Sequence, residues 1–177
     1  NSFFFFFRLR TLLAVQLLSP TQEEPSNTGI CCKNRKTMVK YFRENTRFVF
    51  KGRRDNNEWI KDVIASESAN VKFKAGDINI IFCSDEYLLE LNKKYLSHDF
   101  FTDIITFDNC SDKIISGDLF ISIDRVKENS KTYSSSFDEE LHRVIIHGVL
   151  HLLGYKDKTK AQSEVMREKE SFYLNLR

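Results

Sequence analysis

The stretch from Ser136 to Gly154 constrains the fold of this chain more than any other. Ser136 and Glu139 have the spacing of a capping box, which starts a helix by pairing its free backbone N–H groups. Gly154 is a residue type that commonly ends a helix. Apolar residues recur between them at helical spacing, at Leu141, Val144, Ile145 and Leu152. The pattern predicts one long helix with an apolar stripe that packs on the rest of the chain.

Shorter patterns on either side predict the remaining elements. Strands are expected at 47–51, 77–83, 103–107 and 114–123, where β-branched and other apolar residues alternate or cluster. Helices are expected after Asn57, after Ser84, and after a second capping box formed by Thr159 and Gln162. This order is too irregular for a doubly wound parallel sheet. We therefore expect an α+β fold, in which a small mixed β-sheet of about four strands packs with helices.

The first 37 residues differ from the rest. Five consecutive Phe residues and an apolar run are broken by Arg8 and Arg10, which fits neither a membrane span nor a secretory signal. Met38 is the first methionine, and ordinary patterned sequence begins just after it. We expect 1–37 to be a leader outside the folded domain, arising from start-site choice or upstream translation or else serving as a targeting segment. Residues 38–177 are expected to form a single domain.

Composition restricts the setting in which the protein acts. The 177 residues carry a net charge of only +2, so a protein that coats nucleic acid by bulk charge is excluded and any such contact must be local. The four cysteines have no C-x-x-C spacing, which is typical of reduced thiols in a cytoplasmic protein. We expect a cytoplasmic protein with no membrane partner.

Two histidines at the end of the long helix carry the chemistry. At about 100° per residue, His147 and His151 lie on one face of the helix, one turn apart, which suits two imidazoles that bind one metal ion. Gly154 lets the chain double back and bring Asp157 to the same ion. Two histidines and a carboxylate with an open fourth position are typical of a catalytic zinc site. We expect one Zn²⁺ per chain, at the C-terminal end of a long central helix.

The position between the two histidines restricts the reaction. The spacing is that of the H-E-x-x-H-x-x-G-x-x-H metalloproteases, but Gly148 occupies the place of the glutamate. That glutamate is the general base, and general-base catalysis is commonly worth about 10²–10⁴ in rate. A peptidase of that mechanism is therefore disfavoured. His142 is expected to be a solvated or capping residue, and the role of His98 is left open.

The run from His147 to Tyr155, HGVLHLLGY, resembles the signature H-G-x-L-H-L-x-G-Y-D-H of the YbeY endoribonucleases, also called rRNA maturation factors. Two upstream segments are also similar to that family. Residues 92–95 followed by 102–107 resemble its N-x-x-Y and T-D-V-L-S-F pieces, and 117–121 resembles its G-D-L-x-I strand. The similarity covers roughly residues 77 to 170; residues 1–37 have no counterpart.

The resemblance implies a metal-dependent endoribonuclease specific for single-stranded RNA. It implies action on rRNA, in maturation of the 3′ end of 16S rRNA and in ribosome quality control, with the small ribosomal subunit and its assembly factors as partners. Zinc would be held by His147, His151 and Asp157 and would activate water or polarise a phosphate oxygen. The alternatives are a non-catalytic, metal-stabilised ribosome assembly factor and a metal-dependent hydrolase of small substrates.

The chain departs from the family pattern at two places. Asp157 stands where the family has its third histidine, which makes the site one charge more negative. Leu96 stands where many members have an arginine thought to hold the RNA phosphate, a role that Lys93 or Lys94 would then fill.

Other polar and aromatic residues in the family segments have a structural and a functional interpretation. Asp103 and Asp118 are expected to brace strands rather than to catalyse. Tyr95, Phe100 and Phe101 are expected in the core rather than stacked on bases.

Overall fold

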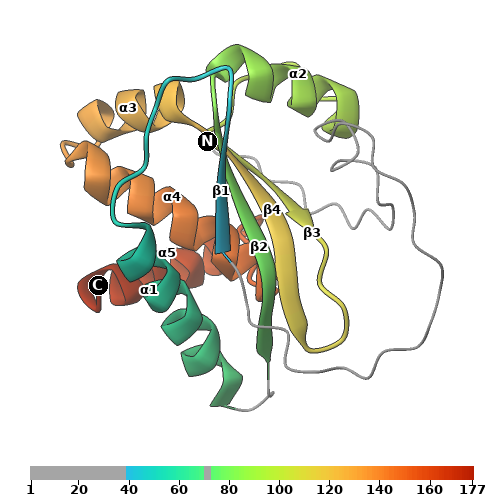
Figure 1. The fold of residues 1–177 in the computed structure, drawn as a ribbon, viewed down its shortest axis with the longest axis vertical. Helices are drawn as coiled ribbons and strands as arrows, with labels where there is room; N and C mark the ends of the chain where they lie inside the picture. Colours follow the sequence, from blue (N-terminus) through green and yellow to red (C-terminus); the bar gives the residue numbers. More distant parts are fainter. Residues whose placement is uncertain (1–38, 70–72) are drawn as a thin grey trace.

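The computed structural model describes residues 39–69 and 73–177, so the expected leader at 1–37 lies outside the described residues. Within them, helices and strands follow one another in an irregular order (Figure 1). The elements are β1 (Val39–Glu44), α1 (Arg53–Ser66), a short 3₁₀ turn (Glu67–Ala69), β2 (Lys74–Cys83), α2 (Asp85–Leu96), β3 (Ile104–Asp108), β4 (Ile114–Ser122), α3 (Ile123–Thr132), α4 (Phe137–Leu152) and α5 (Lys160–Asn175).

The four strands form one mixed sheet in the order β1-β2-β4-β3. β1, β2 and β4 are parallel, and β3 pairs antiparallel with β4. A parallel pair needs a crossover connection, and α1 supplies it between β1 and β2. The α+β fold with a small mixed sheet is therefore confirmed.

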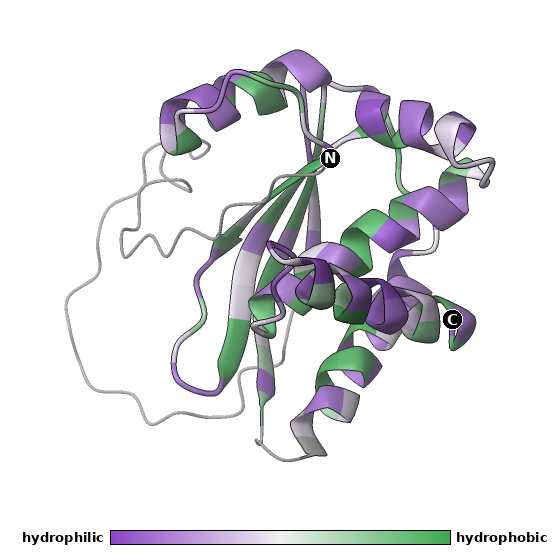
Figure 2. Cartoon of the chain, turned by 180° about the vertical axis from the view of Figure 1, so that it is seen from behind, coloured by the Kyte–Doolittle hydropathy of each residue, from purple (hydrophilic) through white to green (hydrophobic). Residues whose placement is uncertain are grey.

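The two faces of the sheet are covered unequally. Ile78, Ile80 and Phe82 of β2 belong to the larger hydrophobic core, which also contains the apolar sides of α1, α4 and α5. Alternate residues of the same strand, Ile81 and Cys83, belong to a smaller core under α2. Figure 2 shows hydrophobic residues along the strands of the sheet and hydrophilic residues prominent on the outer helices α3 and α5. His147 and His151 lie on α4 and therefore on the side of the larger core.

Helix α4 is the central helix of the larger core. Its capping box is present as expected: Ser136 Oγ accepts from the Glu139 N–H, and the Glu139 carboxylate accepts from the Ser136 N–H. Most of the helix is buried. At Gly148 it approaches the sheet so closely that a Cβ atom would lie 2.6 Å from Leu119 Cδ2 and 2.7 Å from Ile104 Cδ1.

Three expectations for the elements are wrong. The first strand is Val39–Glu44 and not 47–51. Residues 47–51 form no strand, and Phe50 in this segment is buried because its ring stacks on that of Tyr41, with 5.1 Å between the centroids. Helix α1 starts earlier than Asn57, after Gly52 in a left-handed conformation (φ 73°). The third error is the absence of α3 from the expected elements, although Ser122 caps it. In the first two cases, tertiary packing and backbone conformation outweighed the local pattern.

The expected solvated position of His142 is also wrong. Its side chain is buried, because the rings of Phe50 and Trp59 cover it at centroid distances of 5.9 and 6.0 Å. Its Nδ1–H donates to the Asp138 carbonyl. Burial lowers the pKa of His142, so the side chain is held in its neutral form.

The aromatic residues at the end of α2 and in the loop after it differ in burial. Tyr95 packs edge-on against Phe107 with a centroid distance of 5.6 Å. Phe100 and Phe101 are exposed, so the expectation that they lie in the core is wrong. They lie in the loop between α2 and β3, where Phe100 stacks on His98 and the guanidinium of Arg125 on α3 lies 5.0 Å from the centroid of the Phe101 ring.

Among the helices of the described residues, none has the length and apolar character needed to cross a membrane.

Candidate metal centre

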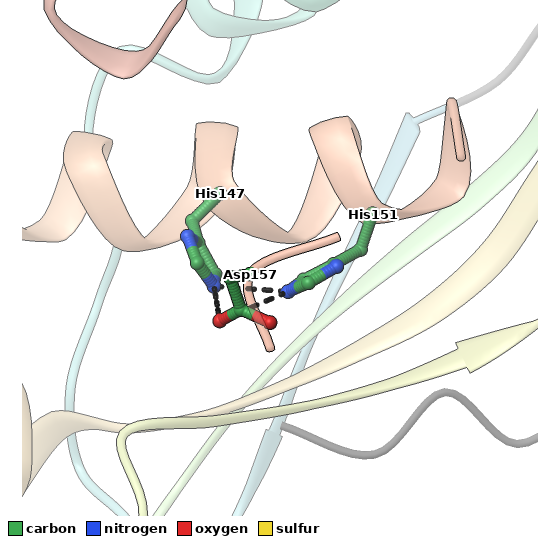
Figure 3. A group of neighbouring side chains, drawn as sticks. All are labelled: His147, His151 and Asp157. Carbon is green, nitrogen blue, oxygen red and sulfur yellow. Dashed lines mark hydrogen bonds and ion pairs between the residues drawn. The ribbon is translucent and has the colours of Figure 1, made fainter. Parts of the chain in front are cut away.

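The structure brings His147, His151 and Asp157 together (Figure 3). The two histidine Nε2 atoms lie 3.0 Å apart. Asp157 Oδ2 lies 3.8 Å from the Nε2 of His147 and 4.0 Å from the Nε2 of His151. Within the described parts of the chain, this is the group of histidine, cysteine or acidic side chains with ligand atoms close enough to share one ion.

A left-handed turn at Gly154 places Asp157. Gly154 has φ 94°, a conformation that side chains other than hydrogen disfavour. Its N–H donates to the His151 carbonyl, and the Tyr155 N–H donates to the Leu150 carbonyl, the two bonds of a Schellman motif. The chain therefore reverses directly after α4 and returns past the two imidazoles, as the spacing predicted.

Each imidazole is oriented through its other nitrogen. His147 Nδ1 contacts the carboxylate of Glu170 on α5, and His151 Nδ1 lies 3.0 Å from the Tyr155 carbonyl. Both partners are acceptors, so in a neutral imidazole at either position the ring proton lies on Nδ1 and Nε2 is the nitrogen available to a metal ion. Both Nε2 atoms face the Asp157 carboxylate (Figure 3).

Three ligand atoms in this arrangement fit a metal ion. The two Nε2 atoms lie 3.0 Å apart, a distance at which two neutral imidazole nitrogens need a shared proton or a metal ion between them. Ligands about 2.0–2.1 Å from a tetrahedral zinc are separated by roughly 3.3 Å, close to the distances found here. Three protein ligands leave one tetrahedral position open, as in catalytic rather than structural sites.

Burial sets the protonation of the site. His147 and His151 are 6% and 4% exposed, and Asp157 forms the more accessible side at 11% side-chain exposure. Burial and the neighbouring charge of His147 lower the pKa of His151 to about 3, which keeps that ligand neutral at physiological pH. Burial raises the pKa of Asp157 above its usual value, and a bound cation would oppose that shift.

Sequence reasoning missed the residues behind His147. Glu170 comes from α5, and the guanidinium of Arg143 on α4 lies between Glu170, Glu140 and Asp103. The available signal was the helical spacing of Glu170 with Met166 and Tyr173, which placed this carboxylate on the buried side of α5.

The remaining candidates lie outside the cluster. Asp118 accepts from the side-chain amides of Asn79 and Asn109, at 2.6 and 3.0 Å, and so joins neighbouring strands. His98 stacks on Phe100 with a centroid distance of 5.0 Å. Lys93 Nζ is 2.8 Å from Asp99, and Lys94 Nζ lies 5.1 Å above the Tyr95 ring.

The fold and the site together define a class of α+β proteins. In this class, three residues that could bind a metal ion lie at the end of a helix that packs on a mixed sheet. Residues 42–176 match the sequence model of the family described as Endoribonuclease YbeY. This chain belongs to the endoribonuclease YbeY family, a family of hydrolytic nucleases.

Individual relatives support the assignment. The chain is 49% identical over 138 residues to the Endoribonuclease YbeY of Cytophaga hutchinsonii. The aligned region covers 77% of this chain and 94% of the relative. It is 50% identical over 125 residues to that of Bacteroides thetaiotaomicron, covering 71% and 88%. Its fold is similar to the solution structure of TM1509 from Thermotoga maritima, with a TM-score of 0.54, 28% identity, and coverage of 78% of this chain and 87% of that one.

Proposed function

We propose that this chain is a zinc-dependent endoribonuclease that cleaves single-stranded RNA. Its role would be in rRNA processing in the cytoplasm, at the 3′ end of 16S rRNA, with the small ribosomal subunit and its assembly factors as partners. The observation that carries the proposal is the convergence of the two histidine Nε2 atoms and the Asp157 carboxylate on one point. Membership of the endoribonuclease family supplies the substrate class.

The residues of the site divide the work. A zinc ion bound there would supply Lewis acidity and lower the pKa of a coordinated water. His147 and His151 would hold it through neutral imidazoles, which the acceptors at Nδ1 keep in the correct tautomer. Asp157, on the more accessible side, would complete the ligand set next to the entering strand. The residues of α4 next to the two histidines, such as Ile146 and Leu150, are buried, so this side of the site is closed to water.

Cleavage of a defined RNA tests this function. The wild-type protein with one equivalent of zinc should cut a single-stranded RNA spanning the 3′ end of precursor 16S rRNA and leave a fully duplex RNA intact. In His147→Ala the cleavage rate should fall by more than the roughly 10²–10⁴-fold that loss of a general base commonly costs. The fall is larger because a site with two ligands no longer holds the metal. Gel analysis of end-labelled RNA under single-turnover conditions measures both rates. Equal cleavage by the wild type and His147→Ala would favour a contaminating nuclease and a non-catalytic assembly factor.

We also propose that Lys93 and Lys94 bind RNA phosphates, since Leu96 leaves the site without the arginine of the family pattern. Both lysines are exposed on the last turn of α2. Replacing both by alanine should weaken RNA binding and make log Kd less dependent on log salt, by about 0.7 for each single-strand phosphate that is no longer neutralised. Fluorescence anisotropy at several salt concentrations measures this slope. The exposed pair Lys127 and Lys131 on α3 provides the matched control; an equal change in both double variants would refute a specific role for α2.

A further inference from the structure

The two histidines of the site are oriented by different kinds of acceptor. His151 Nδ1 faces a backbone carbonyl of its own turn, that of Tyr155. His147 Nδ1 instead contacts a carboxylate, Glu170, from a helix 23 residues further along the chain. Glu170 is 5% exposed. A buried carboxylate costs free energy unless it is paired. The groups that pair with Glu170 therefore decide whether it can lie beside a metal-binding histidine.

Arg143 holds the Glu170 carboxylate in place. An Nη1 atom of Arg143 lies 3.6 Å from Glu170 Oε2, and the same guanidinium binds Glu140 at 2.7 and 2.9 Å. It also lies 3.4 Å from Oδ2 of Asp103, the residue just before β3. Burial would lower the pKa of Arg143, but the hydrogen bonds and charge of Glu140 and the charges of Glu170 and Asp103 outweigh it and raise that pKa. One fixed cation therefore joins α4, α5 and the loop before β3.

The charge of this group reaches the site itself. Arg143 provides one positive charge for three buried carboxylates, those of Asp103, Glu140 and Glu170. Of these carboxylates, Glu170 is the one that contacts His147, so its charge lies directly behind the metal site. A carboxylate that accepts the Nδ1–H of a metal-binding imidazole makes that ligand more basic and favours a divalent cation at its Nε2.

We infer that Glu170 is a positioning residue of the metal centre, held by Arg143. It accepts the Nδ1–H of His147, fixes the tautomer in which Nε2 faces the ion, and raises the affinity of the site for a cation. This inference rests on the proposed metal site and assigns it a carboxylate–histidine–metal arrangement at one histidine only. At His151, the Tyr155 carbonyl orients the ring without adding a charge.

The decisive variant is Glu170→Gln, which keeps the size of the side chain and removes its charge. Affinity for zinc, measured by competition with a chromogenic chelator, should fall about 10- to 100-fold, the range for removing partners of metal-bound histidines. The visible absorption spectrum of the Co²⁺-substituted protein should change in the same variant, because the donor strength and orientation of His147 change.

The matched control is Glu140→Gln. Glu140 is equally buried and binds the same guanidinium, but the described structure gives it no hydrogen bond or ion pair with His147. It should keep zinc affinity within a few-fold of the wild type. An equal loss in both variants would mean that the carboxylates only brace the fold, and unchanged affinity with an unchanged Co²⁺ spectrum in Glu170→Gln would also overturn the inference. Failure of the wild type itself to bind zinc would instead contradict the proposed metal site.

A measurement on the unaltered protein covers the case in which Glu170→Gln does not fold. Long-range ¹H–¹⁵N correlation spectra of the metal-free wild type report which ring nitrogen of each histidine carries the proton. His147 should show a protonated Nδ1 and a bare Nε2. A protonated Nε2 with a bare Nδ1 would exclude the contact with Glu170 as the orienting interaction.

Discussion

We expect the wild-type chain to bind about one zinc per chain, and His151→Ala and Asp157→Ala each to lose it. Each substitution leaves two ligands for an ion that needs at least three protein ligands in a catalytic site. The loss should exceed the roughly 10- to 100-fold expected for a residue that only orients a ligand. Elemental mass spectrometry after dialysis measures the metal directly, before any RNA assay that trace nuclease could distort.

His98→Ala is the matched control for metal content. His98 is a histidine in a loop, stacked on Phe100 and outside the cluster, so its removal should leave the zinc in place. Zinc that survives Asp157→Ala but disappears in His98→Ala would show that the third ligand comes from the loop after α2. A wild type without metal would move the assembly-factor interpretation ahead of the nuclease.

The local parts of the site could be predicted from the sequence. His147, His151, Gly154 and Asp157 lie within eleven consecutive residues, and helical periodicity followed by a left-handed turn dictates their relative positions. The capping box at Ser136 fixed the start of α4 equally well, because its bonds are also local. A pattern that depends only on neighbours in the chain survives folding unchanged.

The distant parts could not be predicted. Glu170 reaches His147 only because α5 packs beside α4, and Arg143 binds a carboxylate, that of Asp103, which lies 40 residues away in the chain. His142 has the sequence setting of a residue on the polar side of its helix, but the rings of Phe50 and Trp59 cover it. The strand expected at 47–51 was wrong for the related reason that apolar side chains can be buried from an irregular segment.

Packing also determines the residue at position 148, where the metalloprotease pattern has a glutamate and this chain has Gly148. Gly148→Glu will strongly destabilise the fold rather than create a peptidase. A Cβ atom at position 148 would lie within 2.7 Å of Leu119 and Ile104, and the carboxylate beyond it would enter the core without a partner. Unpaired buried charge together with overpacking places the expected destabilisation above about 4 kcal/mol, well beyond an ordinary substitution. Urea unfolding followed by circular dichroism measures it.

Two comparisons separate packing from charge at Gly148. Gly148→Ala adds only the Cβ, so the gain in helix propensity of about 1 kcal/mol is set against an overpacking cost of about 1–3 kcal/mol. Ala161→Glu introduces the same carboxylate at an exposed position of α5 and should change stability by less than about 0.5 kcal/mol. If Gly148→Glu were as stable as Ala161→Glu, helix α4 could not lie against β3 and β4 as the structure has it. The glycine is therefore required by the closeness of α4 to the sheet, and that closeness leaves no room for the glutamate that a peptidase of this spacing needs.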